Sequence, residues 1–96
     1  RKQMKVENIK SNNGNKIANQ FIIIDDVGNT FFQSYNSMIV KKTKVTEFID
    51  TIELDQKYWN FSNTTGKYRN IFLNETITET KAKIKSGEYI LTDLNK

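Results

Sequence analysis

Three observations predict an α+β fold: an antiparallel sheet of about four to five strands, two short C-terminal helices packed on it, and a final strand. The first two-thirds of the chain are rich in β-branched and aromatic residues, and short segments of Asn, Asp and Gly that favour turns separate them. The last third holds two segments with apolar residues at helical spacing. With 96 residues the chain can bury one hydrophobic core, so we expect a single domain, 1–96.

The N-terminal half predicts strands joined by tight turns. Residues 4–10 alternate loosely as a short strand does, and Asn13-Gly14 predicts a type I′ hairpin turn because both residues tolerate a positive φ. The second strand, 16–24, ends in the run Phe21-Ile22-Ile23-Ile24, which is apolar on both faces. We therefore expect this strand to be central in the sheet with both sides covered. A turn follows at 25–29.

The middle of the chain is less clearly patterned. A third strand is expected at 30–35. Asn36-Ser37 suits a bend or a bulge, and residues 38–42 return to extended structure, either as a fourth strand or as a continuation of the third. In the region 43–54 the apolar residues have helical spacing, whereas the β-branched content favours strands. We favour a loop with an irregular turn, followed by a strand at 51–54.

The first helix is expected at about 63–73, where Ser62 or Asn63 can cap its N-terminus. Its buried side is predicted to carry Tyr68, Ile71 and Phe72, which lie at the i, i+3, i+4 spacing of one helical face.

The second helix has the clearer end signals. Thr76-Ile77-Thr78-Glu79 matches a capping box, in which the Thr hydroxyl and the Glu carboxylate each satisfy one free backbone N–H group. Gly87 stands where a left-handed residue ends a helix. The segment after Gly87 predicts the final strand.

The composition argues against several kinds of catalytic site. The chain has no Cys and no His, so the usual ligand sets for zinc, copper and iron and the Ser-His and Cys-His nucleophiles are missing. Its four glycines are isolated and form no phosphate-binding loop. Asp25-Asp26 lies in an expected turn, and Glu53 and Asp55 are expected on one exposed strand face. We therefore predict a protein that is not an enzyme, with no catalytic residues, no cofactor and no metal.

The candidate contact residues are basic and aromatic. The net charge of +4 permits binding to nucleic acid or to an acidic protein surface, although it is also typical of an ordinary solvated surface. Basic side chains occur on both predicted helices, and tyrosine is a frequent anchor at protein interfaces. The predicted partner-binding residues are Lys67, Arg69, Lys81, Lys83, Lys85, Tyr35 and Tyr58.

We expect a cytoplasmic protein with no membrane segment. No apolar run approaches the roughly 20 residues that cross a bilayer. The first residues also lack the apolar region of a signal peptide.

Four segments together resemble a family of small proteins and domains carried by phages, plasmids and other mobile elements of low-GC Gram-positive bacteria. They are Ala18 to Ile23, Phe32 to Ser37, Tyr58 to Arg69 and Lys85 to Tyr89. The resemblance implies a non-enzymatic accessory protein that inhibits a host defence nuclease of the CRISPR-Cas9 type by binding its surface. The alternative that it implies is a DNA-binding accessory or regulatory factor of a phage or a conjugative plasmid. The expected partner is accordingly a host protein such as a CRISPR nuclease, or a nucleic acid.

Overall fold

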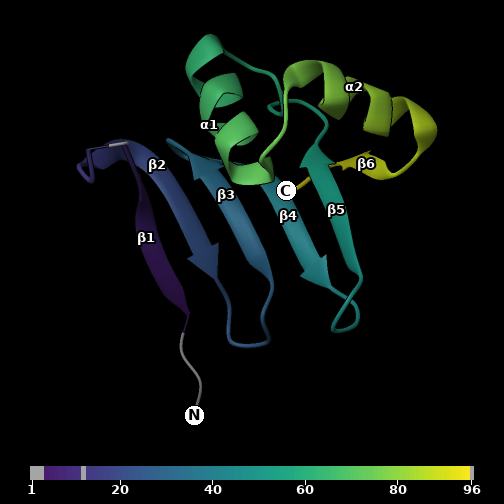
Figure 1. The fold of residues 1–96 in the computed structure, drawn as a ribbon, viewed down its shortest axis with the longest axis horizontal. Helices are drawn as coiled ribbons and strands as arrows, with labels where there is room; N and C mark the ends of the chain where they lie inside the picture. The colour runs from purple at the N-terminus through teal and green to yellow at the C-terminus, as the bar shows by residue number, and fades with distance from the viewer. Residues whose placement is uncertain (1–3, 12, 96) are drawn as a thin grey trace.

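The computed structural model describes residues 4–11 and 13–95. One six-stranded sheet with the strand order β1-β2-β3-β4-β5-β6 carries two helices, so the expected α+β fold is confirmed. Figure 1 shows the strands side by side from β1 (purple) to β6 (yellow), with both helices over the upper part of the sheet in that view. The elements are β1 (Lys5–Lys10), β2 (Lys16–Ile24), β3 (Thr30–Ser34), β4 (Ser37–Lys44), β5 (Asp50–Asp55), α1 (Asn63–Leu73), α2 (Ile77–Ser86) and β6 (Tyr89–Thr92).

The first five strands form an antiparallel meander, and β6 joins it in parallel to β5. A parallel neighbour requires a crossover connection, which α1 and α2 provide here. The region 43–54 divides between the end of β4, a turn and β5, so the expected strand at 51–54 is confirmed.

The β1–β2 loop and the β3–β4 turn test two expectations from the sequence. Asn13-Gly14 does lie between β1 and β2, but the Gly14 N–H donates to the Ser11 carbonyl oxygen over 2.9 Å, so Gly14 ends the hydrogen-bonded turn rather than lying at its centre, and the predicted type I′ turn is wrong. A wider loop closes this hairpin, with the Ser11 N–H donating to the Asn15 carbonyl oxygen over 2.8 Å. Tyr35-Asn36 is the two-residue turn between β3 and β4, so β4 is a separate strand and not a continuation of β3.

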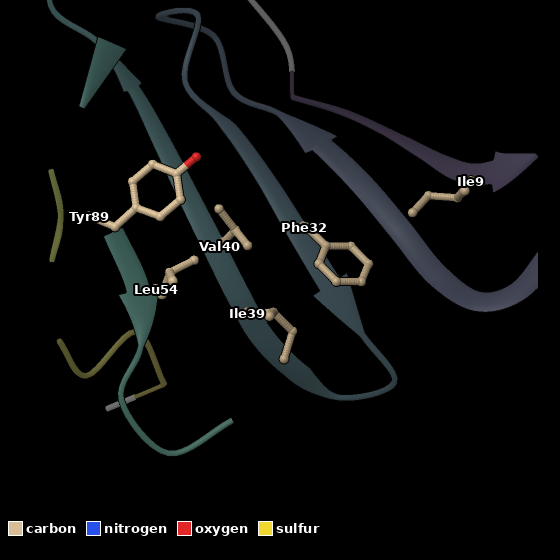
Figure 2. Close-up of a cluster of buried hydrophobic side chains, with 6 residues drawn as sticks. All are labelled: Ile9, Phe32, Ile39, Val40, Leu54 and Tyr89. Carbon is tan, nitrogen blue, oxygen red and sulfur yellow. The ribbon is translucent and has the colours of Figure 1, made fainter. Parts of the chain in front are cut away.

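Both helices pack on one face of the sheet, which we call the covered face. The α1 side chains Tyr68, Phe72 and Leu73 and the α2 side chain Ile84 close over the core. The Phe72 ring stacks on that of Phe32, with the ring centroids 5.8 Å apart. Figure 2 shows the buried side chains, with Ile9 set apart from the others on β1. They are Ile9, Phe32, Ile39, Val40, Leu54 and Tyr89.

The helix ends follow the sequence signals. The Ser62 hydroxyl accepts a hydrogen bond from the Thr65 N–H, which caps α1. Thr76 and Glu79 form the complete capping box of α2, and Gly87 ends that helix with a φ of 88°. These local contacts fix where the helices begin and end.

Candidate functional site

Arg69 lies beneath α1 and not on its outer surface. Its side chain is 1% exposed. Nη1 donates to the Trp59 carbonyl oxygen over 2.8 Å and to Asn60 Oδ1 over 3.0 Å, and Nη2 donates to Asn70 Oδ1 over 2.8 Å. The guanidinium carbon also lies 5.3 Å from the centroid of the Trp59 ring. Burial lowers the pKa of Arg69 from its ordinary value. Arg69 therefore joins α1 to the segment before it, a structural role that differs from the contact with a partner expected for it.

Lys83 is tied to a buried carboxylate that the sequence did not single out. Glu75, between the two helices, has a side chain that is 3% exposed. It accepts hydrogen bonds from Lys83 Nζ (2.8 Å), Thr80 Oγ1 (2.6 Å) and the Tyr89 hydroxyl (2.7 Å). Lys83 thus helps to hold α2 and β6 together, which makes it a weaker candidate for contact with a partner.

The same cluster shifts three pKa values. Burial raises the pKa of Glu75, but the hydrogen bonds from Lys83, Thr80 and Tyr89 outweigh burial and lower it below its ordinary value. The bond to Glu75 raises the pKa of Lys83. Burial, together with the bond to Glu75, raises the pKa of Tyr89 to about 12. At neutral pH, Glu75 is therefore ionised, Lys83 carries its positive charge, and the Tyr89 hydroxyl keeps its proton.

The other predicted lysines are exposed. Lys81 and Lys85 lie one turn apart on α2, and Lys67 lies on α1 with its Nζ 5.3 Å from the centroid of the Tyr68 ring. Lys81 and Lys85 form no ion pair with any residue that the structure describes. They remain available to an acidic partner or to phosphate groups.

Tyr35 and Tyr58, far apart in the sequence, lie at one pocket of about 190 Å³. It opens between the β3–β4 turn and the start of α1. Its lining is mostly apolar, from the two tyrosines, Phe61 and Ile39, with hydroxyl groups of nearby Ser and Thr side chains. The structure thus brings together the two predicted aromatic contact residues. The sequence could not show that they share a pocket, because they lie more than 20 residues apart in the chain.

The backbone around this pocket is fixed by hydrogen bonds. Tyr35 has a positive φ of 55°, which is uncommon for a residue other than glycine. Its N–H donates to the Asn19 carbonyl oxygen, and its carbonyl oxygen accepts from Gln33 Nε2, both over 2.7 Å. On the other side, the Tyr58 ring packs edge-on against the Phe61 ring, with the centroids 5.3 Å apart. Contacts within the chain therefore hold the Tyr35 backbone and pair the Tyr58 and Phe61 rings.

The sheet face opposite the helices, which we call the open face, carries an apolar row. Residues that pair across neighbouring strands point to the same face, and successive residues of a strand alternate between faces. The pairing register therefore places on the open face, opposite Phe32 and Leu54, a row that consists of Val6, Ile23, Phe31, Lys41, Glu53 and Ile90. A second row beside it contains Phe21, Gln33 and Met38.

This arrangement corrects the expectation for the second strand. Ile22 packs against the core, whereas Phe21 and Ile23 lie half-buried on the open face. No helix among residues 4–11 and 13–95 packs on that face. The β2 run from Phe21 to Ile24 is apolar on both faces, as the sequence indicated, but the described residues cover only one face of it.

The acidic residues have structural roles. Asp25 Oδ1 accepts from the backbone N–H groups of Val27 and Asn29, as expected for a turn. Asp55 is buried, so its expected exposure is wrong; its carboxylate accepts from the N–H groups of Lys57, Tyr58 and Leu94. Burial raises the pKa of Asp55, but these backbone bonds lower it below its ordinary value.

Among residues 4–11 and 13–95, no three carboxylate side chains gather in a way that could hold a metal ion. None of the helices in this part of the chain is long and apolar enough to cross a membrane.

No curated protein matches this chain, and no solved structure does. Residues 4–90, which include the whole open-face row, the pocket and both helices, match a family model whose description is a family of unknown function. The chain therefore belongs to the family DUF8033.

Proposed function

We propose that this protein is a non-enzymatic binding protein that attaches to the surface of another protein through the open face of its sheet. The apolar row on that face carries the proposal. An antiparallel sheet with one solvated face normally places polar residues there. Here Ile23 and Phe31 lie half-buried in the row, and Val6 and Ile90 at its two ends are exposed. Val6, Ile23 and Phe31 are direct neighbours in the row, and a contiguous apolar patch of this kind is characteristic of an interaction surface.

The charges on the open face favour a protein partner over a nucleic acid. The middle of the row pairs Lys41 with Glu53, so it presents one cation beside one anion. Phosphate binding needs a contiguous basic surface, which this row does not offer. An apolar patch beside a few charges of both signs is instead the usual composition of a protein interface.

The partner that we propose is a host defence nuclease of the CRISPR-Cas9 type, bound in the bacterial cytoplasm. Support for this partner comes from the resemblance of four segments of the chain to accessory proteins of phages and plasmids. An inhibitor that works by occupying a surface needs no catalytic residues, which agrees with a chain that lacks Cys and His.

A matched pair of substitutions tests the proposal. Ile90 on the open face is 50% exposed and Ile71 on α1 is 53% exposed, so a lysine costs little stability at either position. Cleavage of guide-matched DNA by Cas9 from a low-GC Gram-positive host is measured with increasing amounts of each variant. We expect Ile90→Lys to weaken inhibition by about tenfold or more, because it places a charge in an apolar interface, and Ile71→Lys to inhibit as the unmodified protein does. Equal inhibition by both variants contradicts the proposed face.

DNA binding is the alternative function, and the exposure of Lys81 and Lys85 one turn apart on α2 favours it. A gel shift on labelled duplex at two salt concentrations separates the two functions. Phosphate contacts weaken steeply as salt increases, since binding releases counterions. A salt-sensitive shift that is lost in a Lys81→Ala, Lys85→Ala double variant, together with no inhibition of the nuclease, assigns the protein to DNA binding.

A further inference from the structure

We propose that the pocket between the β3–β4 turn and the start of α1 binds a single phenol-type ring, that is, one six-membered ring with an oxygen substituent. This site is separate from the open face and goes beyond the proposed function. The volume sets the size of the ligand. A dry apolar cavity of about 150 Å³ accepts benzene, and sites for drug-sized ligands measure about 300 to 1,000 Å³. At about 190 Å³, this pocket has room for one ring with a small substituent.

The walls of the pocket suit the faces and edges of a ring. Tyr58 and Phe61 already pack edge-on, which leaves aromatic surface of both turned toward the pocket. Ile39 supplies an aliphatic wall, and Tyr35 stands at the rim on its positive-φ backbone. Unfavourable backbone conformations persist where the surrounding structure holds them, and they are frequent at ligand sites. A ring in the pocket covers apolar surface of Tyr35 and Phe61 that is otherwise in water.

The hydroxyl groups in the pocket indicate why the ring carries an oxygen. Each of Ser34, Ser62 and Thr65 has one proton to donate. Ser62 donates to Thr65 Oγ1 over 3.2 Å, and Ser34 Oγ and Thr65 Oγ1, 3.1 Å apart, share one more proton. Three hydroxyl protons thus make two bonds. The third, on Ser34 or Thr65, has no acceptor among the described residues, although both side chains line the pocket. A ligand oxygen is the acceptor that it lacks.

Two sources can present this chemistry, a free small phenol and the tyrosine side chain of a peptide or protein. The probes are therefore p-cresol, which is the tyrosine side chain alone, N-acetyl-tyrosinamide, which adds the backbone, and toluene, which lacks the oxygen. They are titrated into the full chain while backbone amide signals are followed by NMR. A ligand with this few atoms binds in the range of about 1 mM. We expect p-cresol to shift the signals of Ser34, Tyr35 and Thr65 and to bind about three- to tenfold more tightly than toluene.

The amide probe identifies the source. If N-acetyl-tyrosinamide binds as tightly as p-cresol, the site takes a tyrosine side chain; if only p-cresol binds, it takes a free phenol. Either result supports the proposal. It is overturned if p-cresol shifts no signal near the pocket, or if toluene binds as tightly as p-cresol.

Matched variants place the binding in this pocket. Phe61 is 68% exposed, so Phe61→Ala removes one wall at little cost to the fold, and Phe48→Ala removes a ring that is 90% exposed in the β4–β5 turn. We expect Phe61→Ala to weaken p-cresol binding by about tenfold and Phe48→Ala to leave it unchanged. Equal binding by Phe61→Ala and Phe48→Ala overturns the assignment. None of these outcomes depends on whether the open face binds a nuclease.

Discussion

Replacing Glu75 with glutamine tests the buried cluster that joins α1, α2 and β6. The change keeps the size of the side chain and removes its charge. In the native protein Glu75 accepts three hydrogen bonds, from Lys83, Thr80 and Tyr89. A hydrogen bond to a charged group contributes about 1.5 to 3 kcal/mol, and one between neutral groups about 0.5 to 1.5 kcal/mol. The loss of about 1 kcal/mol at each of three bonds gives about 3 kcal/mol, which the partial exposure of Lys83 reduces to about 2 kcal/mol.

Urea unfolding at pH 7, followed by the fluorescence of Trp59, the one tryptophan, measures this loss. Glu79→Gln is the matched control. It is the same chemical change four residues away, and a capping box accepts Gln in place of Glu, so we expect a loss below about 0.5 kcal/mol. If Glu75→Gln costs no more than Glu79→Gln, the three bonds do not hold the helices to the sheet and the reasoning is refuted.

Three further predictions concern other buried or strained groups. Glu75 and Asp55 have lower pKa values in the folded chain than in the unfolded one, so their contribution to stability is complete above about pH 5 and is lost as the pH falls through the folded pKa values. We expect the urea midpoint to be similar at pH 7 and pH 5 and lower at pH 3. An unchanged midpoint at pH 3 contradicts this. Gln20 is fully buried, and neither the oxygen nor the nitrogen of its side-chain amide has a hydrogen-bond partner among the described residues. Gln20→Met should raise the free energy of unfolding by about 1 kcal/mol, since it removes an unsatisfied amide at similar volume. A loss of stability shows instead that the amide is satisfied. Tyr35 has a positive φ. Tyr35→Gly should therefore be about 1 kcal/mol more stable than Tyr35→Ala, because both variants lose the ring and only glycine adopts this backbone conformation freely. The reverse order of stability in thermal unfolding contradicts the claim that the Tyr35 backbone is strained.

The elements could be predicted from the sequence wherever their signals are local. Ser62, the capping box at Thr76 and Gly87 determine helix ends through contacts within four residues, so the predicted and observed ends agree. The parallel pairing of β6 with β5 has no such signal, because it depends on how the two helices cross the sheet. The type I′ turn failed for a related reason: Asn13-Gly14 permits that turn, but the register of the two strands requires a wider loop.

The buried side of α1 was predicted only approximately. Tyr68 and Phe72 pack against the core as expected, but Ile71 is more than half exposed. Thr65 and Arg69, one turn apart, are buried instead. Arg69 lies three residues before Phe72, so its position in the helix places it on the same side as a core residue. Its hydrophobicity does not indicate burial, because arginine is seldom fully buried. Arg69 is buried because it donates hydrogen bonds to Trp59 and Asn60 in the preceding loop.

The candidate sites depend on contacts that the sequence does not show. The chain's apolar run on β2 suggested a strand covered on both sides, and only the placement of the helices shows which side stays uncovered. Tyr35 and Tyr58 were each predicted as contact residues, but that they share a pocket follows from the fold. Glu75 is one acid among eleven, with no motif around it, and its burial comes from the packing of α2 and β6.

The inhibition assay with Ile90→Lys and Ile71→Lys tests the central claim, that the open face is the binding surface, most directly. The two isoleucines are almost equally exposed and lie on opposite sides of the sheet, so general effects on folding or solubility act on both variants alike. If the claim is right, Ile90→Lys inhibits Cas9 about tenfold more weakly than the unmodified protein, and Ile71→Lys inhibits equally well. Full inhibition by Ile90→Lys, or the same loss in both variants, contradicts it.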